Sequence, residues 1–362
     1  MIKLSIVGDL FPGGVIVDRE DFISQELLDL FKTADIRVAT LESAIGDSYP
    51  FDYEKMCNPE WRNIVFSPNR SLAKLSKLHI DVVALANNHI YDLGAEGLNN
   101  VIDLLDRAGI SYCGAGKNIE EASKPAVVSI KGKKIAFLSY MVYFEGWRAP
   151  HPASKDRPGL NIFDLKSAVK DIKIAKSKYD YVFILPHWGT EYSYWPTQED
   201  VYYSRQLLKA GADGIFGSHA HVVQPYITIK KKPVFFGMGN FLFPDFYMNI
   251  DRTTFYPTSQ EEVENLPITY NYERHPQKPM LRKWPENNRQ GVVANIMIED
   301  MIRYRVVHIK NSKSNHIEID ENPIYVKTIK KIGFSIKYIP YKLIIRLIYL
   351  KRIVKQIFRK IK

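Results

Sequence analysis

The sequence predicts an α/β fold in which buried strands alternate with amphipathic helices. Short apolar and β-branched runs, such as residues 2–8 and 181–185, have the composition of strands buried on both faces. Patterns with an apolar stripe at helical spacing separate such runs, as at residues 95–108. Polar residues follow several of the apolar runs directly. Because ligands bind at the carboxyl ends of strands in open α/β sheets, we expect a functional site there.

The composition is that of a globular chain. Its 362 residues, 46% hydrophobic and 25% charged, suffice for one large α/β domain or two smaller ones. Cys57 and Cys113 lack the spacing of a disulfide framework or a zinc ribbon, so we expect free thiols in a reducing compartment, with Cys113 buried. Residues 1–7 are too short for a signal peptide and lead into the first strand, which favours a cytoplasmic location.

In the first half of the chain, polar residues follow each expected strand. We expect strands at residues 2–8, 37–41 and 81–86, and helices at residues 21–32, 72–78 and 95–108. Asp9 comes after the first strand, Glu42 after the second, and Asn87, Asn88 and His89 after the third. A carboxylate such as Glu42 costs free energy when buried unless it is paired or bound to a cation. Asn87 and Asn88 by themselves could be turn residues.

The second half supplies histidines at the same kind of position. We expect a hairpin at residues 125–130 and 134–138, strands at 181–185, 213–216 and 233–237, a helix at 202–210, and paired strands at 291–298 and 304–309. His187 follows the first of these strands, and His219 and His221 follow the second. In an extended His-x-His segment both rings lie on one side, and neutral imidazole is a common metal ligand.

The repeated arrangement predicts a metal site. Carboxylates, an amide and imidazoles would meet at one sheet edge, because the carboxyl ends of parallel strands lie together. A mixed oxygen and nitrogen set suits Mn, Fe or Zn better than Ca or Mg, which prefer oxygen ligands throughout. We therefore expect one or two divalent transition-metal ions.

These motifs resemble those of the CapA family of capsule-synthesis proteins, also called the poly-γ-glutamate synthesis protein family, within the calcineurin-like metallophosphoesterase superfamily. The likeness runs from about residue 2 to residue 243. Its motifs are Gly8-Asp9, Leu41-Glu42, Asn87-Asn88-His89 with Asp92 and Gly94, His187-Trp188-Gly189 with Glu191, Gly217-Ser218-His219-Ala220-His221 with Gln224, and Gly239-Asn240-Phe241.

The resemblance implies a four-layer α/β/β/α sandwich with a di-metal centre. It implies that His89 is the catalytic proton donor or charge stabiliser beside the substrate, and that the metal ligands are Asp9, Glu42, Asn88, His187, His219 and His221. Residues expected behind the ligands or beside the substrate are Asn87, Asp92, Glu191, Tyr192 and Asn240. The wider superfamily carries His where this chain has Phe11, so the first metal site lacks an imidazole and one bound ion is an alternative to two.

The function implied is metal-dependent hydrolysis of phosphoesterase type, acting on an anionic polymer or phosphoester in capsule or exopolysaccharide biosynthesis. One alternative is a non-catalytic accessory protein of a capsule polymer assembly machine. Another is amide or peptide-bond chemistry on a polyglutamate-like polymer. His89 favours an enzyme over an accessory protein, because a structural metal site needs ligands but no acid.

We expect one CapA-like domain at residues 1–312, with a long insert inside it and a basic tail after it. Residues 244–290, rich in Pro, Tyr and Asn, form an insert that we interpret as a lid or wall beside the site, with a disordered surface loop as the equal alternative. Arg274 and Arg282 within it are candidate substrate contacts.

Residues 323–362 form a basic tail. From Lys327 onward it holds 12 Lys and Arg and no acidic residue, which leaves 38 basic against 40 acidic residues before it. Apolar residues recur at helical spacing from residue 340, but basic residues interrupt them too often for a transmembrane helix. We expect this helix at the anionic inner membrane surface, with a capsule-assembly partner or its own domain as alternatives, and no binding to nucleic acid.

Overall fold

The computed structural model describes most of the chain. The described residues are 1–47, 64–143, 151–248, 254–255, 260–265, 269–270 and 276–323. Cys57, Arg274 and the basic tail lie outside them, so the expectations for these residues stay predictions.

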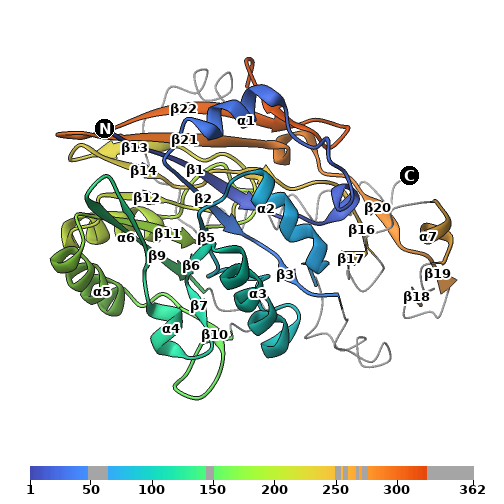
Figure 1. Ribbon diagram of the computed structural model, residues 1–362, viewed down its shortest axis with the longest axis horizontal. Helices are drawn as coiled ribbons and strands as arrows, with labels where there is room; N and C mark the ends of the chain where they lie inside the picture. Colours follow the sequence, from blue (N-terminus) through green and yellow to red (C-terminus); the bar gives the residue numbers. More distant parts are fainter. Residues whose placement is uncertain are drawn as a thin grey trace, which may run out of the picture.

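The first sheet contains the amino-terminal strands. It has eight strands in the order β23-β22-β21-β1-β2-β5-β6, with β15 also paired to β1 (Figure 1). β1, β2, β5 and β6 run parallel, and β21 to β23 add to them antiparallel. The bounds are β1 Ile2–Leu10, β2 Ile36–Leu41, β5 Val82–Ala84, β6 Ser111–Cys113, β15 Asn240–Leu242, β21 Gln290–Ile298, β22 Ile302–Asn311 and β23 Ile317–Ile319.

The second sheet has six strands in the order β13-β14-β12-β11-β9-β8. Its four central strands are parallel, and the hairpin partners β8 and β13 close its two edges antiparallel. The bounds are β8 Ala126–Ile130, β9 Lys133–Met141, β11 Tyr181–His187, β12 Gly214–Phe216, β13 Tyr226–Ile229 and β14 Lys232–Phe235.

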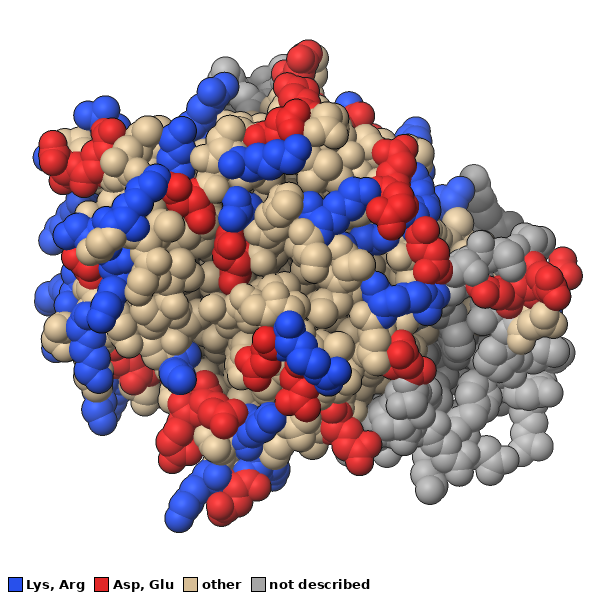
Figure 2. All heavy atoms as spheres, in the orientation of Figure 1, with Lys and Arg blue, Asp and Glu red and all other residues tan. Residues whose placement is uncertain are grey.

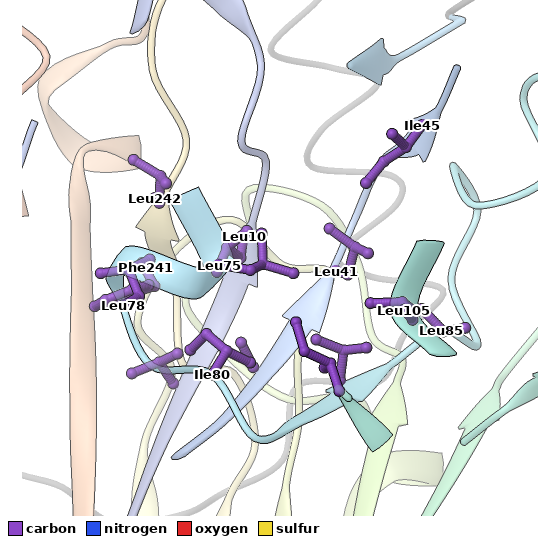
Figure 3. Packing of buried hydrophobic residues seen from close by; sticks show 14 of the residues in the cluster. Leu10, Leu41, Ile45, Leu75, Leu78, Ile80, Leu85, Leu105, Phe241 and Leu242 are labelled. Carbon is purple, nitrogen blue, oxygen red and sulfur yellow. The ribbon is translucent and has the colours of Figure 1, made fainter. Parts of the chain in front are cut away.

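Three apolar layers hold the sheets and helices together. One core cluster lies between the sheets and includes Leu4 of β1 and Phe183 of β11. A second packs α1 (Gln25–Lys32), α2 (Ala73–Lys77) and α3 (Gly94–Ala108) on the first sheet. Figure 3 shows the part of it that includes Leu75 of α2 and Leu105 of α3. A third packs α5 (Leu165–Lys178) and α6 (Gln198–Ala210) on the second sheet (Figure 1). The expected four-layer α/β/β/α sandwich is confirmed.

Several helices begin at a residue whose side chain accepts a backbone N–H. Ser24 caps α1, Asp164 caps α5, and Thr197 caps α6 in a reciprocal capping box with Asp200. Each such cap satisfies a donor that has no partner inside the helix. The short α4 (Ile119–Ser123) is capped by Asn118 in the same way. The caps fix where each crossover helix starts after its strand.

The described part of residues 244–290 is more regular than the sequence indicated. β16 (Phe246–Met248) pairs with β17 (Thr254–Phe255) and β20 (Met280–Arg282) in a small antiparallel sheet. Strands as short as these leave no long apolar run in the sequence. This explains why an irregular loop was expected. The remaining small elements are η1 Gly14–Ile16, β3 Ala44–Ile45, β4 Phe66–Ser67, η4 Asn69–Leu72, β7 Ala115–Gly116, β10 Gly159–Leu160, α7 Gln260–Asn265, β18 Thr269–Tyr270, β19 Pro276–Gln277 and η5 Glu286–Asn288.

The surface shown in Figure 2 mixes both signs of charge. Lys and Arg alternate with Asp and Glu over this face, in keeping with the near balance of charge before the tail. Cys113 is buried, as expected. None of the helices in the described part of the chain is long and apolar enough to span a membrane.

The packing between the two sheets predicts how a substitution there changes the free energy of unfolding. Phe183 is fully buried there, with its ring 5.9 Å from the rings of both Phe137 and Phe216. Phe183→Ala should lower the free energy of unfolding by about 3–5 kcal/mol, because it removes a buried ring and leaves a cavity. Ile174→Ala on α5, where the side chain is 44% exposed, is the control and should cost under ~0.5 kcal/mol in chemical denaturation. Equal losses in both variants would contradict the inter-sheet core.

Candidate metal centre

The expected ligands come together, but from two sheets instead of one sheet edge. The first sheet supplies Asp9 within β1, Glu42 directly after β2, and Asn88 in the loop after β5. The second supplies His187 as the last residue of β11, and His219 and His221 in the loop after β12. Because both sheets are parallel at their centres, the carboxyl ends of these strands meet at one end of the sandwich.

Two groups of candidate ligands share one carboxylate. Ligand atoms of Glu42, His187 and His219 lie within 4.8 Å of one another, and so do those of Asp9, Glu42 and His221. All five residues are buried. Asn88 joins the first group, since its Oδ1 is 2.6 Å from Nε2 of His187. The arrangement offers two adjacent cation sites bridged by Glu42.

The histidines after β12 do not adopt the extended conformation that the sequence suggested. His219 has φ of 91° and His221 has φ of 52°, both in the left-handed region. Their ring centroids are 6.5 Å apart, and each ring belongs to a different group of ligands. Backbone conformations of this kind cost about 1–3 kcal/mol in non-glycine residues and persist only where the surroundings enforce them. The turn therefore divides the two imidazoles between the two sites.

The surroundings of Glu42 indicate whether a cation fits the site. Its side chain is 0% exposed, yet neither carboxylate oxygen has a hydrogen-bond partner among the described residues. Its nearest nitrogens are Nε2 of His187 and of His221, each 3.6 Å from Oε1. A buried carboxylate without donors is expensive unless it is protonated or bound to a cation. The side chains that surround Glu42 are themselves candidate metal ligands. The residues present therefore fit the expected ion.

The surroundings of His187 give the same result. Its Nε2 faces Oδ1 of Asn88 at 2.6 Å and Nδ1 of His219 at 3.0 Å, as well as the carboxylate of Glu42. A single ring proton could satisfy only one of these acceptors, whereas a cation would satisfy all of them. Convergence of carboxylate, amide and imidazole atoms on one point is typical of Mn, Fe or Zn sites.

Polar side chains behind the ligands orient the imidazole rings. Ser218 places its Oγ 3.0 Å from Nδ1 of His187. Asn240 donates from Nδ2 to the carbonyl of Asn288, so its Oδ1 accepts from Nδ1 of His221 at 2.9 Å. His221 then turns Nε2 toward Glu42. Such outer contacts fix the tautomer and direction of metal-binding histidines. The expectation that Asn240 lies behind a ligand agrees with this geometry.

Burial gives the site unusual pKa values. It raises the pKa of Asp9 to about 7 and, together with the negative charge of Asp9, raises the pKa of Glu42 well above its usual range. Burial also lowers the pKa of His187 far below its usual value, of His219 to about 3 and of His221 to about 4. The imidazoles are therefore neutral near pH 7, which is the state that binds metals.

His89 lies at the rim of the centre, with its side chain 12% exposed. Its Nδ1 is 2.7 Å from Oδ2 of Asp92, which also accepts the backbone N–H of Val65. Asn87 holds the turn, since its Oδ1 accepts the backbone N–H groups of His89 and Ile90. The contact at Nδ1 thus fixes the orientation of the His89 ring.

The remaining expected residues fall into three cases. Burial, the negative charge of Asp9 and the negative charge of Glu191 together raise the pKa of Glu42. Tyr192 is 46% exposed and stacks on His221, with ring centroids 6.0 Å apart. Arg274 lies outside the described residues.

Sequence reasoning missed the aromatic side of the site. The ring of Trp284 lies 5.5 Å from that of His221, and the ring of Phe243 lies 5.1 Å from it. Phe11, where a further imidazole was expected from the superfamily, packs on Phe243 and is fully buried. Trp284 carries no local motif, so only its tertiary contact could have revealed it.

Comparison with known proteins places this centre in a family. Residues 3–245 match the family described as bacterial capsule synthesis protein PGA_cap. The capsule biosynthesis protein CapA of Bacillus anthracis is 28% identical over 252 residues, covering 67% of this chain and 60% of that protein. The PGA biosynthesis protein CapA of Bacillus subtilis is 28% identical over 251 residues, covering 67% and 63%. The chain thus spans less than two thirds of the length of these relatives.

Solved structures resemble the chain only distantly. A 5′-nucleotidase from Candida albicans is 11% identical, with a TM-score of 0.41, and the match covers 91% of this chain and 57% of that one. The family match covers well over half of the sequence and contains all of the candidate ligands. The chain belongs to the bacterial capsule synthesis protein family PGA_cap.

Proposed function

We propose that the chain is a metal-dependent phosphoester hydrolase that acts in the production of a bacterial capsule or poly-γ-glutamate-like polymer. The observation that carries the proposal is the pair of ligand groups joined at Glu42, beside an Asp-oriented histidine. The names of the two Bacillus relatives refer to capsule biosynthesis and to PGA biosynthesis. Membership of the same family supports a role of this kind for this chain. A structural metal site would not require His89.

The proposed cofactor is one or two divalent transition-metal ions. Asp9, Glu42 and His221 would hold one, and Glu42, Asn88, His187 and His219 the other. When bound, such ions polarise a phosphoryl group and lower the pKa of water. Asn240 and Ser218 hold the rings of His221 and His187 in the orientation that metal binding would require.

The residues around the ligands have distinct proposed roles. His89 donates a proton from Nε2 to the leaving oxygen, while Asp92 fixes the ring through Nδ1. Asn87 holds the turn that carries His89 and Asn88, so both reach the centre from one loop. The burial of Asp9 and Glu42 excludes water from behind the reacting group and strengthens electrostatic contacts there.

Metal binding should depend on pH, because it must displace protons. The raised pKa of Asp9, about 7, and the raised pKa of Glu42 keep both carboxyls protonated in mildly acidic metal-free protein. We expect Mn²⁺ affinity to rise between about pH 5 and pH 8, by up to ~10-fold per pH unit for each proton displaced. Calorimetry in buffers of different ionisation enthalpy should measure the proton release.

The same shifts set the sign of the stability change. Protonated Asp9 is favoured in the folded state, so its contribution to stability is present below about pH 4 and is lost as the pH rises through about 7. Chelated protein should therefore gain more melting temperature from added Mn²⁺ at pH 8 than at pH 5. Equal gains at both pH values, without proton release, would contradict the protonation of this centre.

His89→Gln should reduce phosphoester hydrolysis by about 100- to 10,000-fold while metal content stays unchanged, since it removes the proton donor but no ligand. The substrate for this measurement is 4-methylumbelliferyl phosphate, with metal quantified in the same samples. His316→Gln is the matched control, because His316 also faces a carboxylate, Asp21 at 3.1 Å, but belongs to neither group of ligands. Full activity in His89→Gln would remove His89 from the mechanism, whereas a metal-loaded wild type that hydrolyses no phosphoester would favour the accessory-protein alternative.

A further inference from the structure

An aromatic wall, formed by Phe243 and Trp284, lies on one side of the metal centre. Both rings contact the ring of His221. They are edge to face, 5.2 Å apart. Phe243 lies within the family match and Trp284 lies beyond its last residue, 245, so Trp284 is a part of the site that the family match does not cover.

Trp284 is held on three sides. Its backbone N–H donates to Oδ1 of Asp245 at 2.9 Å, and its Nε1 donates to the carbonyl of Pro244 at 3.2 Å. Its own carbonyl accepts from Nε of Arg289 at 3.1 Å. Arg289 and Asp245 form a buried ion pair at 2.6 Å, which ties the wall to the end of the first sheet. Trp284 is consequently a rigid platform and not a flexible rim residue.

Arg282 lies on this platform. Its guanidinium carbon is 5.8 Å from the ring centre of Trp284 and 6.0 Å from that of Phe246, which pairs with Arg282 between β16 and β20. Stacking on aromatic faces orients a guanidinium while leaving its N–H groups at the edge for acceptors. The side chain is exposed, and no carboxylate of the described residues forms an ion pair with it. Its Nη1 donates to the thioether of Met248, a weak acceptor at 3.6 Å.

The stacked, exposed guanidinium of Arg282 offers its N–H groups to an anion. Carboxylates crowd the centre itself, since Asp9 and Glu42 are both among the candidate ligands. A fixed cation on the neighbouring wall complements a substrate that extends past the scissile group with further negative charge. Guanidinium groups bind carboxylates and phosphates in forked geometry, so either oxyanion would be accepted.

We propose that Arg282, stacked on Trp284, is a specificity-determining residue that selects phosphoesters with a second oxyanion next to the phosphoryl group. This proposal deepens the proposed function and rests on it for the identity of the reacting group. The substrate class is thus a polyanionic phosphoester, such as a unit within an anionic polymer, and not a simple neutral alcohol ester.

The test uses non-hydrolysable ligands, so that binding is measured apart from turnover. Calorimetry on Mn²⁺-loaded full-length protein compares phosphonoacetate and 3-phosphonopropionate with ethylphosphonate and propylphosphonate, which lack the carboxylate. Wild type should bind at least one carboxylated ligand about 5- to 10-fold more tightly than the matched ligand without a carboxylate. A difference of this size is expected for one charged hydrogen-bonded contact at an exposed site. Arg282→Gln should reduce this preference to under about 2-fold, and Arg282→Lys should retain part of it.

Lys283→Gln is the matched control, because it removes an adjacent exposed positive charge without touching the platform. It should leave the preference unchanged, as should metal content in every variant. The proposal is overturned if wild type shows no preference, if Arg282→Gln keeps it, or if Lys283→Gln loses it equally. Failure of the proposed function looks different, since the Arg282-dependent preference would persist in a protein that hydrolyses no phosphoester.

Discussion

The buried carboxylate of Glu42 is the constraint on which the site depends. It is enclosed where the two sheets meet, it has no hydrogen-bond donor among the described residues, and it is shared by both groups of ligands. An ionised carboxylate in such a place destabilises the fold unless a cation or a proton neutralises it. The surrounding imidazoles are kept neutral by burial and cannot supply that charge. A bound metal would resolve the conflict that the fold creates.

The fold brings these residues together through parallel strands in two sheets. Asp9 and Glu42 belong to neighbouring strands of the first sheet, and His187 ends a strand of the second. The left-handed turn at His219 and His221 then sends one imidazole to each group. Strain is tolerated there because contacts on both sides of the turn enforce it, including the bond from the His219 N–H to the Asp9 carboxylate. Rigid strands and one strained turn thus set the spacing of the ligands.

Much of this could be predicted from the sequence because its signals are local. Strand periodicity placed Asp9, Glu42 and His187 at strand ends, and motif resemblance supplied the sandwich and the ligand set. The extended conformation expected for His219 and His221 was wrong, because the left-handed turn that sends them to different groups of ligands arises from tertiary contacts. The roles of Ser218 and Trp284 were missed for the same reason, because each acts through a residue distant in sequence. The positive charge of Arg282 could be read from the sequence, but its stacking on Trp284 could not.

The most direct measurement of the central claim is the metal content of wild type beside that of Glu42→Gln, an isosteric change that removes the shared charge. Both proteins would be loaded with Mn²⁺, dialysed and analysed for metal per chain, with Glu199→Gln on the exposed face of α6 as control. The account predicts one or two equivalents in wild type and in the control, and loss of all bound metal in Glu42→Gln. Equal metal content in Glu42→Gln and wild type would contradict the role of Glu42 as the common ligand.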